Sequence, residues 1–84
     1  MNKMRVEKQK GMAESVAIIF GKRLQEIRKE MQLTQKQMAD NLMVAESTYA
    51  NWEQGRREPN LWCLIVIKNT LKISFDELLD FDKY

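Results

Sequence analysis

The chain has 84 residues, of which 44% are hydrophobic and 31% are charged, and its formal net charge at pH 7 is +2. A chain of this length forms one small domain, because chains divide into several hydrophobic cores only beyond about 250 residues. The composition is typical of an ordinary globular domain and excludes a chain that is disordered throughout. The net charge is too small to identify a polyanionic partner, so the placement of the charges matters more than their sum.

Two residue types that carry much of enzyme and metal chemistry are scarce in this sequence. It contains no histidine and a single cysteine, Cys63, which excludes an intramolecular disulfide and any zinc site built on cysteine pairs. No glycine-rich phosphate loop organises the serine, aspartate and glutamate residues that are present. We therefore expect a protein that is not an enzyme and that holds no cofactor and no metal.

The apolar segments indicate where the protein acts. The longest run, residues 61–67, is far shorter than the roughly 18 residues of a membrane span, and we expect it to form a buried helix. Residues 1–10 are basic, but the apolar stretch 16–20 that follows is too short for a secretory signal and has no small-residue cleavage site. We therefore expect a cytoplasmic protein that does not contact a membrane.

The first two helices are predicted from apolar periodicity and from a capping signal. Apolar residues recur at helical spacing along the first helix, at Phe20, Leu24, Ile27 and Met31. Thr34 and Gln37 then form a capping box, in which the hydroxyl and the amide bond backbone groups at a helix start. A short second helix is expected over about residues 35–42, with Met38, Ala39 and Leu42 facing inward.

Three further helices follow. The third is expected over about residues 45–54, with Val44, Tyr49 and Trp52 on its inner face and Gly55 at its end. Pro59 cannot continue a helix, and Asn60 can cap a fourth one over about residues 61–71. A second capping box at residues 74–77 opens a fifth, short helix that reaches about residue 79.

A pair of short helices joined by a tight turn can place the second helix in the major groove of duplex DNA. In order and spacing, the sequence resembles the phage-repressor and Cro type (XRE-type) helix-turn-helix DNA-binding family over about residues 20–79. The resemblance implies an all-α fold, a compact five-helix lambda-repressor-like domain with an N-terminal extension of helix 1. The matching segments are 20–24 (FGKRL), 33–35 (LTQ), Ala39, 51–56 (NWEQGR), 58–59 (EP) and 73–79 (ISFDELL).

The domain organisation follows from these elements. We expect a basic N-terminal arm or helical extension at residues 1–15, the helix-turn-helix DNA-binding domain at residues 16–80, and a C-terminal tail at residues 81–84. The arm carries four cations that can lie along phosphates or reach a minor groove, or that can form a solvated tail: Lys3, Arg5, Lys8 and Lys10.

The resemblance also implies which positions meet DNA bases. In this family the outer face of the third helix lies against base edges, and its residues in this sequence are Glu46, Ser47, Ala50 and Asn51. Asn51 can bond adenine through two hydrogen bonds, and Ser47 can meet several bases. Glu46 has two interpretations: it accepts a hydrogen bond from cytosine, or it stabilises the positive end of the helix dipole by about 0.3 to 1 kcal/mol.

Other positions match contacts to the DNA backbone. Gln35 matches a position that contacts the backbone and braces the recognition helix, and Thr48 is placed for a phosphate or base contact. Arg28, Arg56 and Arg57 match regions that flank the groove and pair with phosphates. The alternative interpretation for Gln35 and these arginines is solvated surface without a DNA partner.

Two positions in the motif depart from the family pattern. Met43 occupies the turn position where the family favours glycine, because that residue usually has φ > 0, at a cost of roughly 1 kcal/mol for other residues. Ala45 replaces the usual Ser or Thr cap of the third helix, which forfeits about 1 kcal/mol of capping. Both changes weaken the motif without excluding it.

Apolar residues also stand where the family has polar surface on the fourth helix, at Trp62, Cys63 and Val66. They predict a dimer or partner interface, most simply that of a homodimer. The alternative is that Phe81 or Tyr84 from the chain's own C-terminus packs there.

Two functions remain after these exclusions. The first is a sequence-specific transcriptional regulator, expected to be a repressor, that binds double-stranded DNA as a homodimer on a two-fold operator and reads the major groove with the helix at residues 45–54. The alternative is a protein-interaction module, such as an antitoxin or adapter, that uses the same fold. The acidic balance of residues 34–54 favours this alternative.

Overall fold

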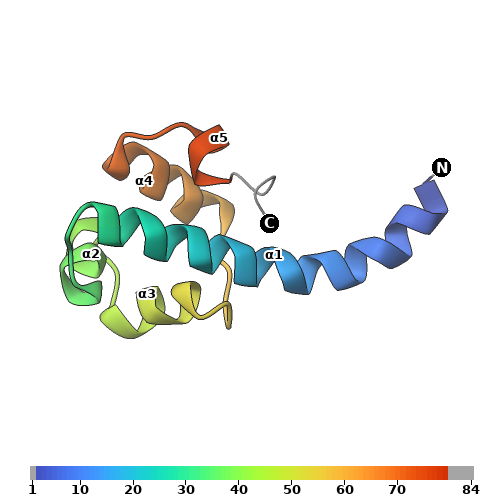
Figure 1. The fold of residues 1–84 in the computed structure, drawn as a ribbon, viewed down its shortest axis with the longest axis horizontal. Helices are drawn as coiled ribbons and strands as arrows, with labels where there is room; N and C mark the ends of the chain where they lie inside the picture. Colours follow the sequence, from blue (N-terminus) through green and yellow to red (C-terminus); the bar gives the residue numbers. More distant parts are fainter. Residues whose placement is uncertain (1, 80–84) are drawn as a thin grey trace.

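The computed structural model describes the backbone of residues 2–79 and the side chains of residues 16–79. Residues 2–79 form helices joined by short connections, with no β-strand among them, so the expected all-α fold is confirmed (Figure 1). The helices are α1 (Asn2–Glu30), α2 (Gln35–Leu42), α3 (Glu46–Glu53), α4 (Leu61–Leu71) and α5 (Phe75–Leu78).

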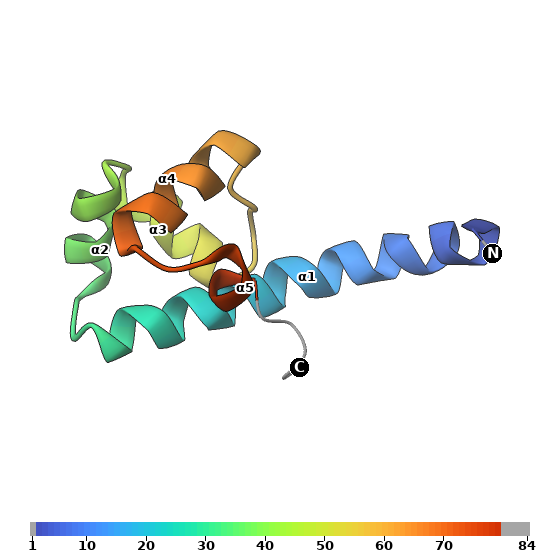
Figure 2. The same ribbon diagram turned by 90° about the horizontal axis from the view of Figure 1, so that it is seen from above.

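The long helix α1 is the axis of the fold. It packs against α3 and α5, while α2 packs against α3 and α4. The N-terminal half of α1 projects beyond the other helices in both views, which gives the described chain a longest dimension of 43 Å (Figures 1 and 2). The predicted extension of helix 1 is therefore present as continuous helical backbone.

Local capping signals set most helix starts. The Thr34 and Ser74 capping boxes are both formed, and the side chain of Asn60 accepts a hydrogen bond from the backbone N–H of Cys63 at 2.8 Å. These starts lie where the sequence predicted them. Met31 was wrongly placed on the inner stripe of helix 1, because α1 ends at Glu30 and Met31 lies in the turn that follows, 43% exposed.

The core lies where α1, α2, α3, α4 and α5 converge. On α1 it contains the predicted stripe of Phe20, Leu24 and Ile27, each at most 5% exposed. Burial of such side chains stabilises the fold by about 1.5 to 3 kcal/mol each. The remaining buried apolar residues of the cluster come from the other helices: Met38, Ala39, Leu42, Tyr49, Trp52, Ile67, Leu71 and Leu78.

Gly21 allows α1 and α3 to approach closely. A Cβ atom placed on Gly21 would fall within 2.5 Å of the Trp52 carbonyl oxygen and 2.8 Å of the Glu53 carbonyl carbon. Neither group can move easily, because both belong to the backbone at the end of α3. The absence of a side chain at Gly21 therefore fixes the distance between α1 and the end of α3.

Helix α4 is less buried than the sequence predicted. Its residues Ile67 and Leu71 are buried, but Leu61 and Trp62 are 73% and 71% exposed. The expectation of a buried helix at residues 61–67 was wrong, because no described segment covers the face opposite the core. None of the described helices is both long enough and apolar enough to cross a membrane.

Candidate nucleic-acid interface

The turn between α2 and α3 is built on a left-handed residue. Met43 has φ 60° and ψ 40°, and its N–H donates to the Asp40 carbonyl at 3.1 Å. The next N–H, of Val44, donates to the Ala39 carbonyl at 3.0 Å and closes α2. The left-handed conformation expected at Met43 is therefore confirmed, and its strain of roughly 1 kcal/mol is a cost of this turn.

The N-terminus of α3 has no side-chain cap. Ala45 occupies the N-cap position with extended backbone and makes no capping hydrogen bond, as the sequence predicted. Tertiary packing stabilises the helix instead, since Tyr49 and Trp52 are at most 3% exposed. Their rings meet edge to face with centroids 6.2 Å apart.

The other end of α3 carries a buried carboxylate, Glu53, that accepts hydrogen bonds from three helices. Arg28 on α1 donates from Nε at 2.6 Å and from Nη2 at 3.2 Å. Gln35 on α2 donates from Nε2 at 3.0 Å, and Tyr49 on α3 itself donates from its hydroxyl at 2.5 Å. We call these four residues the Glu53 network. It fixes α3 against both α1 and α2.

The network keeps the carboxylate ionised. Burial raises the pKa of Glu53, but the hydrogen bonds from Arg28, Tyr49 and Gln35 outweigh it, so the pKa lies below its usual value. The hydrogen bond to Glu53 raises the pKa of Arg28. Burial and then the hydrogen bond to the Glu53 carboxylate raise the pKa of Tyr49, so this hydroxyl keeps its proton. The buried charge is thus fully paired.

This network revises the role expected for Arg28. Its side chain is 11% exposed and is shared between Glu53 and the Leu33 carbonyl, which accepts from Nη1 at 2.8 Å. Arg28 therefore belongs to the internal network and not with the exposed cations that can meet phosphates. Gln35 does brace α3, through its bond to Glu53.

The role of Glu53 was not predicted from the sequence. One signal was available: Glu53 stands one helical turn after the inward-facing Tyr49, at a position that points toward the core. A carboxylate in that position requires buried donors.

The outer face of α3 is polar and open. Glu46 and Ser47 are exposed, and Thr48, Ala50 and Asn51 are partly exposed. The structure thus gathers the predicted base-contact positions on one side of α3, away from the packed face.

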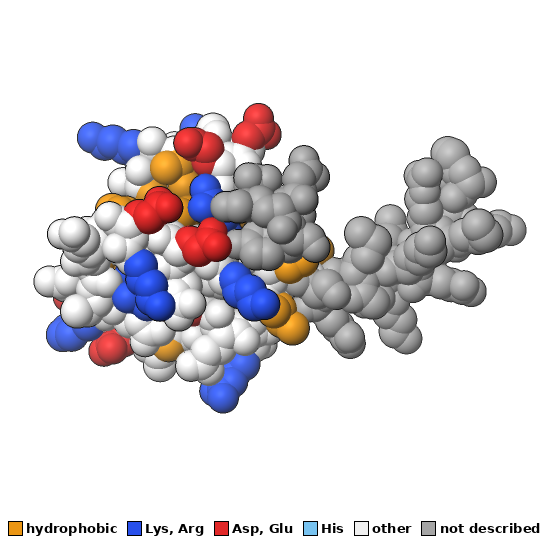
Figure 3. All heavy atoms as spheres, viewed as in Figure 1, with side chains coloured by type: hydrophobic (Ala, Val, Ile, Leu, Met, Phe, Trp, Pro, Cys, Tyr) orange, Lys and Arg blue, Asp and Glu red, His pale blue; other side chains and the backbone are white. Residues whose placement is uncertain are grey.

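Two exposed arginines follow at the end of α3. The backbone N–H groups of Arg56 and Arg57 both donate to the Asn51 carbonyl, at 3.0 and 3.4 Å. Neither side chain pairs with an acidic group within residues 16–79. Figure 3 shows basic side chains, together with acidic ones, around the lower edge of the molecule, the side on which α3 lies in Figure 1. Arg56 and Arg57 are both exposed and follow α3 closely in the chain.

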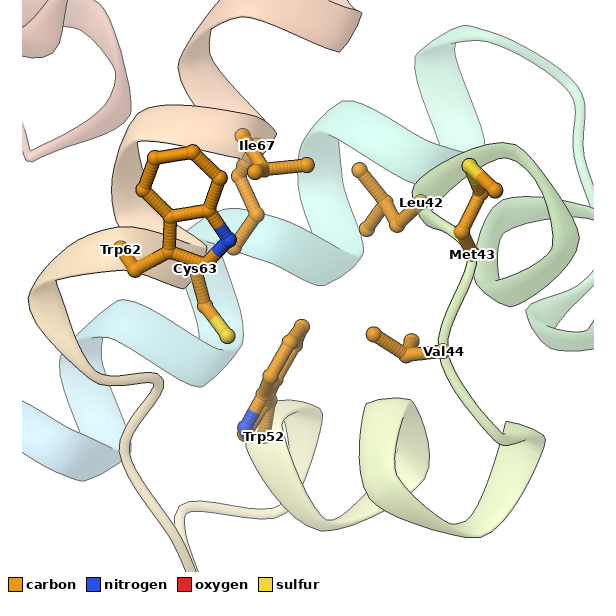
Figure 4. A pocket seen from close by; sticks show the side chains of 8 residues that line it. Leu42, Met43, Val44, Trp52, Trp62, Cys63 and Ile67 are labelled. Carbon is orange, nitrogen blue, oxygen red and sulfur yellow. The ribbon is translucent and has the colours of Figure 1, made fainter.

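An apolar groove separates the α2–α3 turn from α4. Its volume is about 420 Å³, and its walls are formed by Leu42, Met43, Val44, Trp52, Trp62, Cys63, Val66 and Ile67. In Figure 4, Trp62 and Val44 border it from opposite sides, and the Cys63 sulfur points toward Trp52. The three residues predicted as an interface, Trp62, Cys63 and Val66, all line this groove.

Two earlier expectations lie outside the described part of the chain. The first is the contact of the basic arm with DNA, because the structure does not describe the side chains of Lys3, Arg5, Lys8 and Lys10. The second is the packing of Phe81 or Tyr84 on α4, because both residues lie outside residues 2–79.

The sequence matches the Helix-turn-helix family over residues 24–78, which covers all of α2, α3, α4 and α5. The chain belongs to this XRE-type helix-turn-helix family. It is 43% identical over 61 residues to YqaE of Bacillus subtilis (strain 168), described as an uncharacterized HTH-type transcriptional regulator; the match covers 73% of this chain and 53% of YqaE.

A phage relative and a solved structure support the same assignment. RstR of Vibrio cholerae, the transcriptional repressor of cryptic phage CTXphi, is 39% identical over 56 residues, covering 67% of this chain and 50% of RstR. This chain spans about half the length of these curated relatives. The crystal structure of the restriction-modification controller protein C.AhdI from Aeromonas hydrophila superimposes with a TM-score of 0.69 and 29% identity, covering 74% of this chain and 94% of C.AhdI.

Proposed function

We propose that this protein is a sequence-specific transcriptional regulator that reads the major groove of double-stranded DNA with α3. The observation that carries the proposal is the division of α3 into two faces. Tyr49, Trp52 and the Glu53 network hold one face against α1 and α2, and the other face is polar and open. A short helix held in this way enters the roughly 12 Å major groove without reordering.

The open face of α3 supplies the base contacts in this proposal. The Asn51 amide donates to N7 and accepts from the amino group of adenine, while the Ser47 hydroxyl adapts to several bases. The Ala50 methyl group packs on a thymine methyl. Glu46 is the base-contact position at the N-terminal end of this face of α3.

The positions that flank this face supply the backbone contacts. Arg56 and Arg57 neutralise phosphates at the C-terminal end of α3. Thr48 and the amide N–H of Gln35 that is not bonded to Glu53 donate to phosphate oxygens. Such contacts set the register of the helix on the duplex but carry no sequence information. Arg28 is not among them, because Glu53 and the Leu33 carbonyl already hold its guanidinium group.

We further propose that the protein binds as a homodimer to a two-fold operator, with half-sites about one helical turn, roughly 10 to 10.5 bp, apart. The interface is assigned to Trp62, Cys63 and Val66 on the rim of the apolar groove. The 71% exposure of Trp62 supports this assignment, since a large exposed aromatic side chain with apolar neighbours is typical of an interface. Sedimentation equilibrium of the wild type and Trp62→Ala tests it: a wild-type monomer at all concentrations would overturn the dimer.

Repression is the expected sign of regulation. Relatives in this family are named both as repressors and as activators, and RstR is one of the repressors. A reporter gene placed behind the selected operator is expected to lose expression when the protein is present. An increase would overturn repression and leave DNA binding untouched.

Selection of bound duplexes from a random library, at low and at high salt, tests the proposed function. The expected result is enrichment of a near-palindrome with half-sites about one turn apart. Asn51→Ala is then expected to lose roughly 5- to 150-fold in affinity for the selected site and little on random DNA. No enrichment at either salt concentration would overturn the proposal.

The apolar groove favours a second candidate, a protein-interaction module such as an antitoxin or adapter. The two candidates differ in their response to salt. Contacts between arginines and phosphates make the logarithm of the affinity fall with the logarithm of salt concentration, with a slope of about −0.9 per contact. An interface built on Trp62 responds weakly to salt, so a flat salt dependence would favour the second candidate.

A further inference from the structure

The outer face of α3 carries a negative charge and no positive charge. Residues 46–53 contain no lysine and no arginine, and their two carboxylates have opposite environments. Glu53 is 8% exposed and lies inside its network, while Glu46 is exposed in the first turn of the helix. Glu46 is therefore the one ionisable group that this face can present to a groove.

The Glu46 carboxylate has no internal partner in the described part of the chain. It forms no ion pair with any residue of 16–79, and the N-cap of α3 has no side-chain hydrogen bond. The favourable interaction with the helix dipole is already present in the free protein and does not depend on the base that lies opposite. It therefore does not offset the repulsion that phosphates exert on this carboxylate when the protein binds DNA.

Among the four bases, cytosine suits this carboxylate best. An ionised carboxylate only accepts hydrogen bonds. In the major groove, guanine presents two acceptors and thymine an acceptor and a methyl group, so neither can donate to it. Adenine presents its amino group next to the N7 acceptor, which repels the second carboxylate oxygen. Cytosine presents an amino group and no acceptor on its own major-groove edge.

We propose that Glu46 is a specificity-determining residue that requires a cytosine at one position of each half-site, an inference that rests on the function proposed above. It acts mainly by exclusion. Opposite any other base, the carboxylate loses water and gains no donor, so those sequences bind more weakly. The same penalty applies to random DNA and widens the gap between specific and non-specific binding.

The test compares library selections made with the wild type, Glu46→Gln and Glu58→Gln. Glutamine keeps the size of the side chain and removes its charge. Glu58 is the matched control, because it is an exposed carboxylate in the connector after α3 and lies off the outer face. Circular dichroism verifies that all three proteins keep their helices. Affinities are then measured on the selected site, on its three substitutions at the cytosine position, and on a random duplex.

The wild type is expected to enrich one cytosine per half-site and to lose roughly 5- to 150-fold in affinity when that base pair is replaced. Glu46→Gln is expected to lose this preference and to bind random DNA more tightly, while Glu58→Gln keeps the preference. A wild-type site without the cytosine, or a preference that persists in Glu46→Gln, would overturn this inference alone. No enrichment of any sequence would overturn the proposed function and this inference with it.

Discussion

The two ends of α3 are held in different ways. At its C-terminal end, Glu53 accepts hydrogen bonds from α1, α2 and α3, and the backbone lies directly against Gly21. At its N-terminal end, the chain enters through the left-handed Met43 and the uncapped Ala45. A short helix can therefore keep its place with a weak start when its other end is fixed by a buried network. The predictions below test this division.

The largest expected effect is at Glu53. Glu53→Ala leaves Arg28, Tyr49 and Gln35 without their shared acceptor, and the mostly buried Arg28 guanidinium without its counter-charge. We expect the free energy of unfolding, measured with urea, to fall by about 3 to 5 kcal/mol. Glu46→Ala, at the other end of α3, is the control and should cost less than about 1 kcal/mol. Equal losses would contradict the comparison.

Gly21→Ala tests the close approach of α1 to the same end of α3. The new methyl group would overlap the Trp52 and Glu53 carbonyl groups and push the helices apart. We expect a loss of about 1 to 3 kcal/mol in thermal or urea unfolding. Gln25→Ala, on the exposed side of α1, should change stability by less than about 0.5 kcal/mol. A Gly21→Ala protein as stable as the wild type would show that the helices can separate freely.

The Glu53 network also predicts a pH dependence. The pKa of Glu53 is lower in the folded than in the unfolded state, so its contribution is complete above the unfolded value of about 4.3. It is lost as the pH falls from there through the folded pKa, by at most about 1.4 kcal/mol per pH unit. The free energy of unfolding in urea, measured over this pH range, should fall less steeply with decreasing pH for Glu53→Gln than for the wild type. The same pH dependence in both proteins would show that Glu53 does not contribute to the loss of stability in acid.

The smallest effect is expected at the weak end of α3. Ala45→Ser supplies the missing acceptor for a backbone N–H in the first turn and should raise the stability by about 1 kcal/mol. Ala45→Val offers no acceptor and is expected to bring no such gain. If Ala45→Ser does not stabilise the protein, water already satisfies these N–H groups as well as a cap does.

The sequence predicted the features that are determined locally. Thr34, Asn60 and Ser74 cap helices through atoms only a few residues away, and the Phe20, Leu24 and Ile27 stripe follows from helical periodicity. The outer face of α3 followed from the same periodicity together with the family resemblance. These parts of the fold and of the candidate site depend on little beyond neighbouring residues.

The features that the sequence did not predict depend on tertiary contacts. Arg28 and Glu53 are 25 residues apart, and nothing near Arg28 indicates that its guanidinium points inward. Leu61 and Trp62 lie in an apolar run that periodicity cannot assign to core or surface, because residues 61–67 include no polar position. Only the packing of the other helices decides which face is covered.

The Glu53 network also ties the folding of α3 to helices that precede it in the chain. An isolated helix of fewer than about 12 to 15 residues is marginal in water, and α3 has 8. Its helical state therefore depends on partners that come earlier in the chain, on α1 and α2. In a nascent chain, α3 and its proposed DNA-reading face therefore form only when residues 28–53 are all available to fold together, and we expect a peptide of α3 alone not to bind an operator.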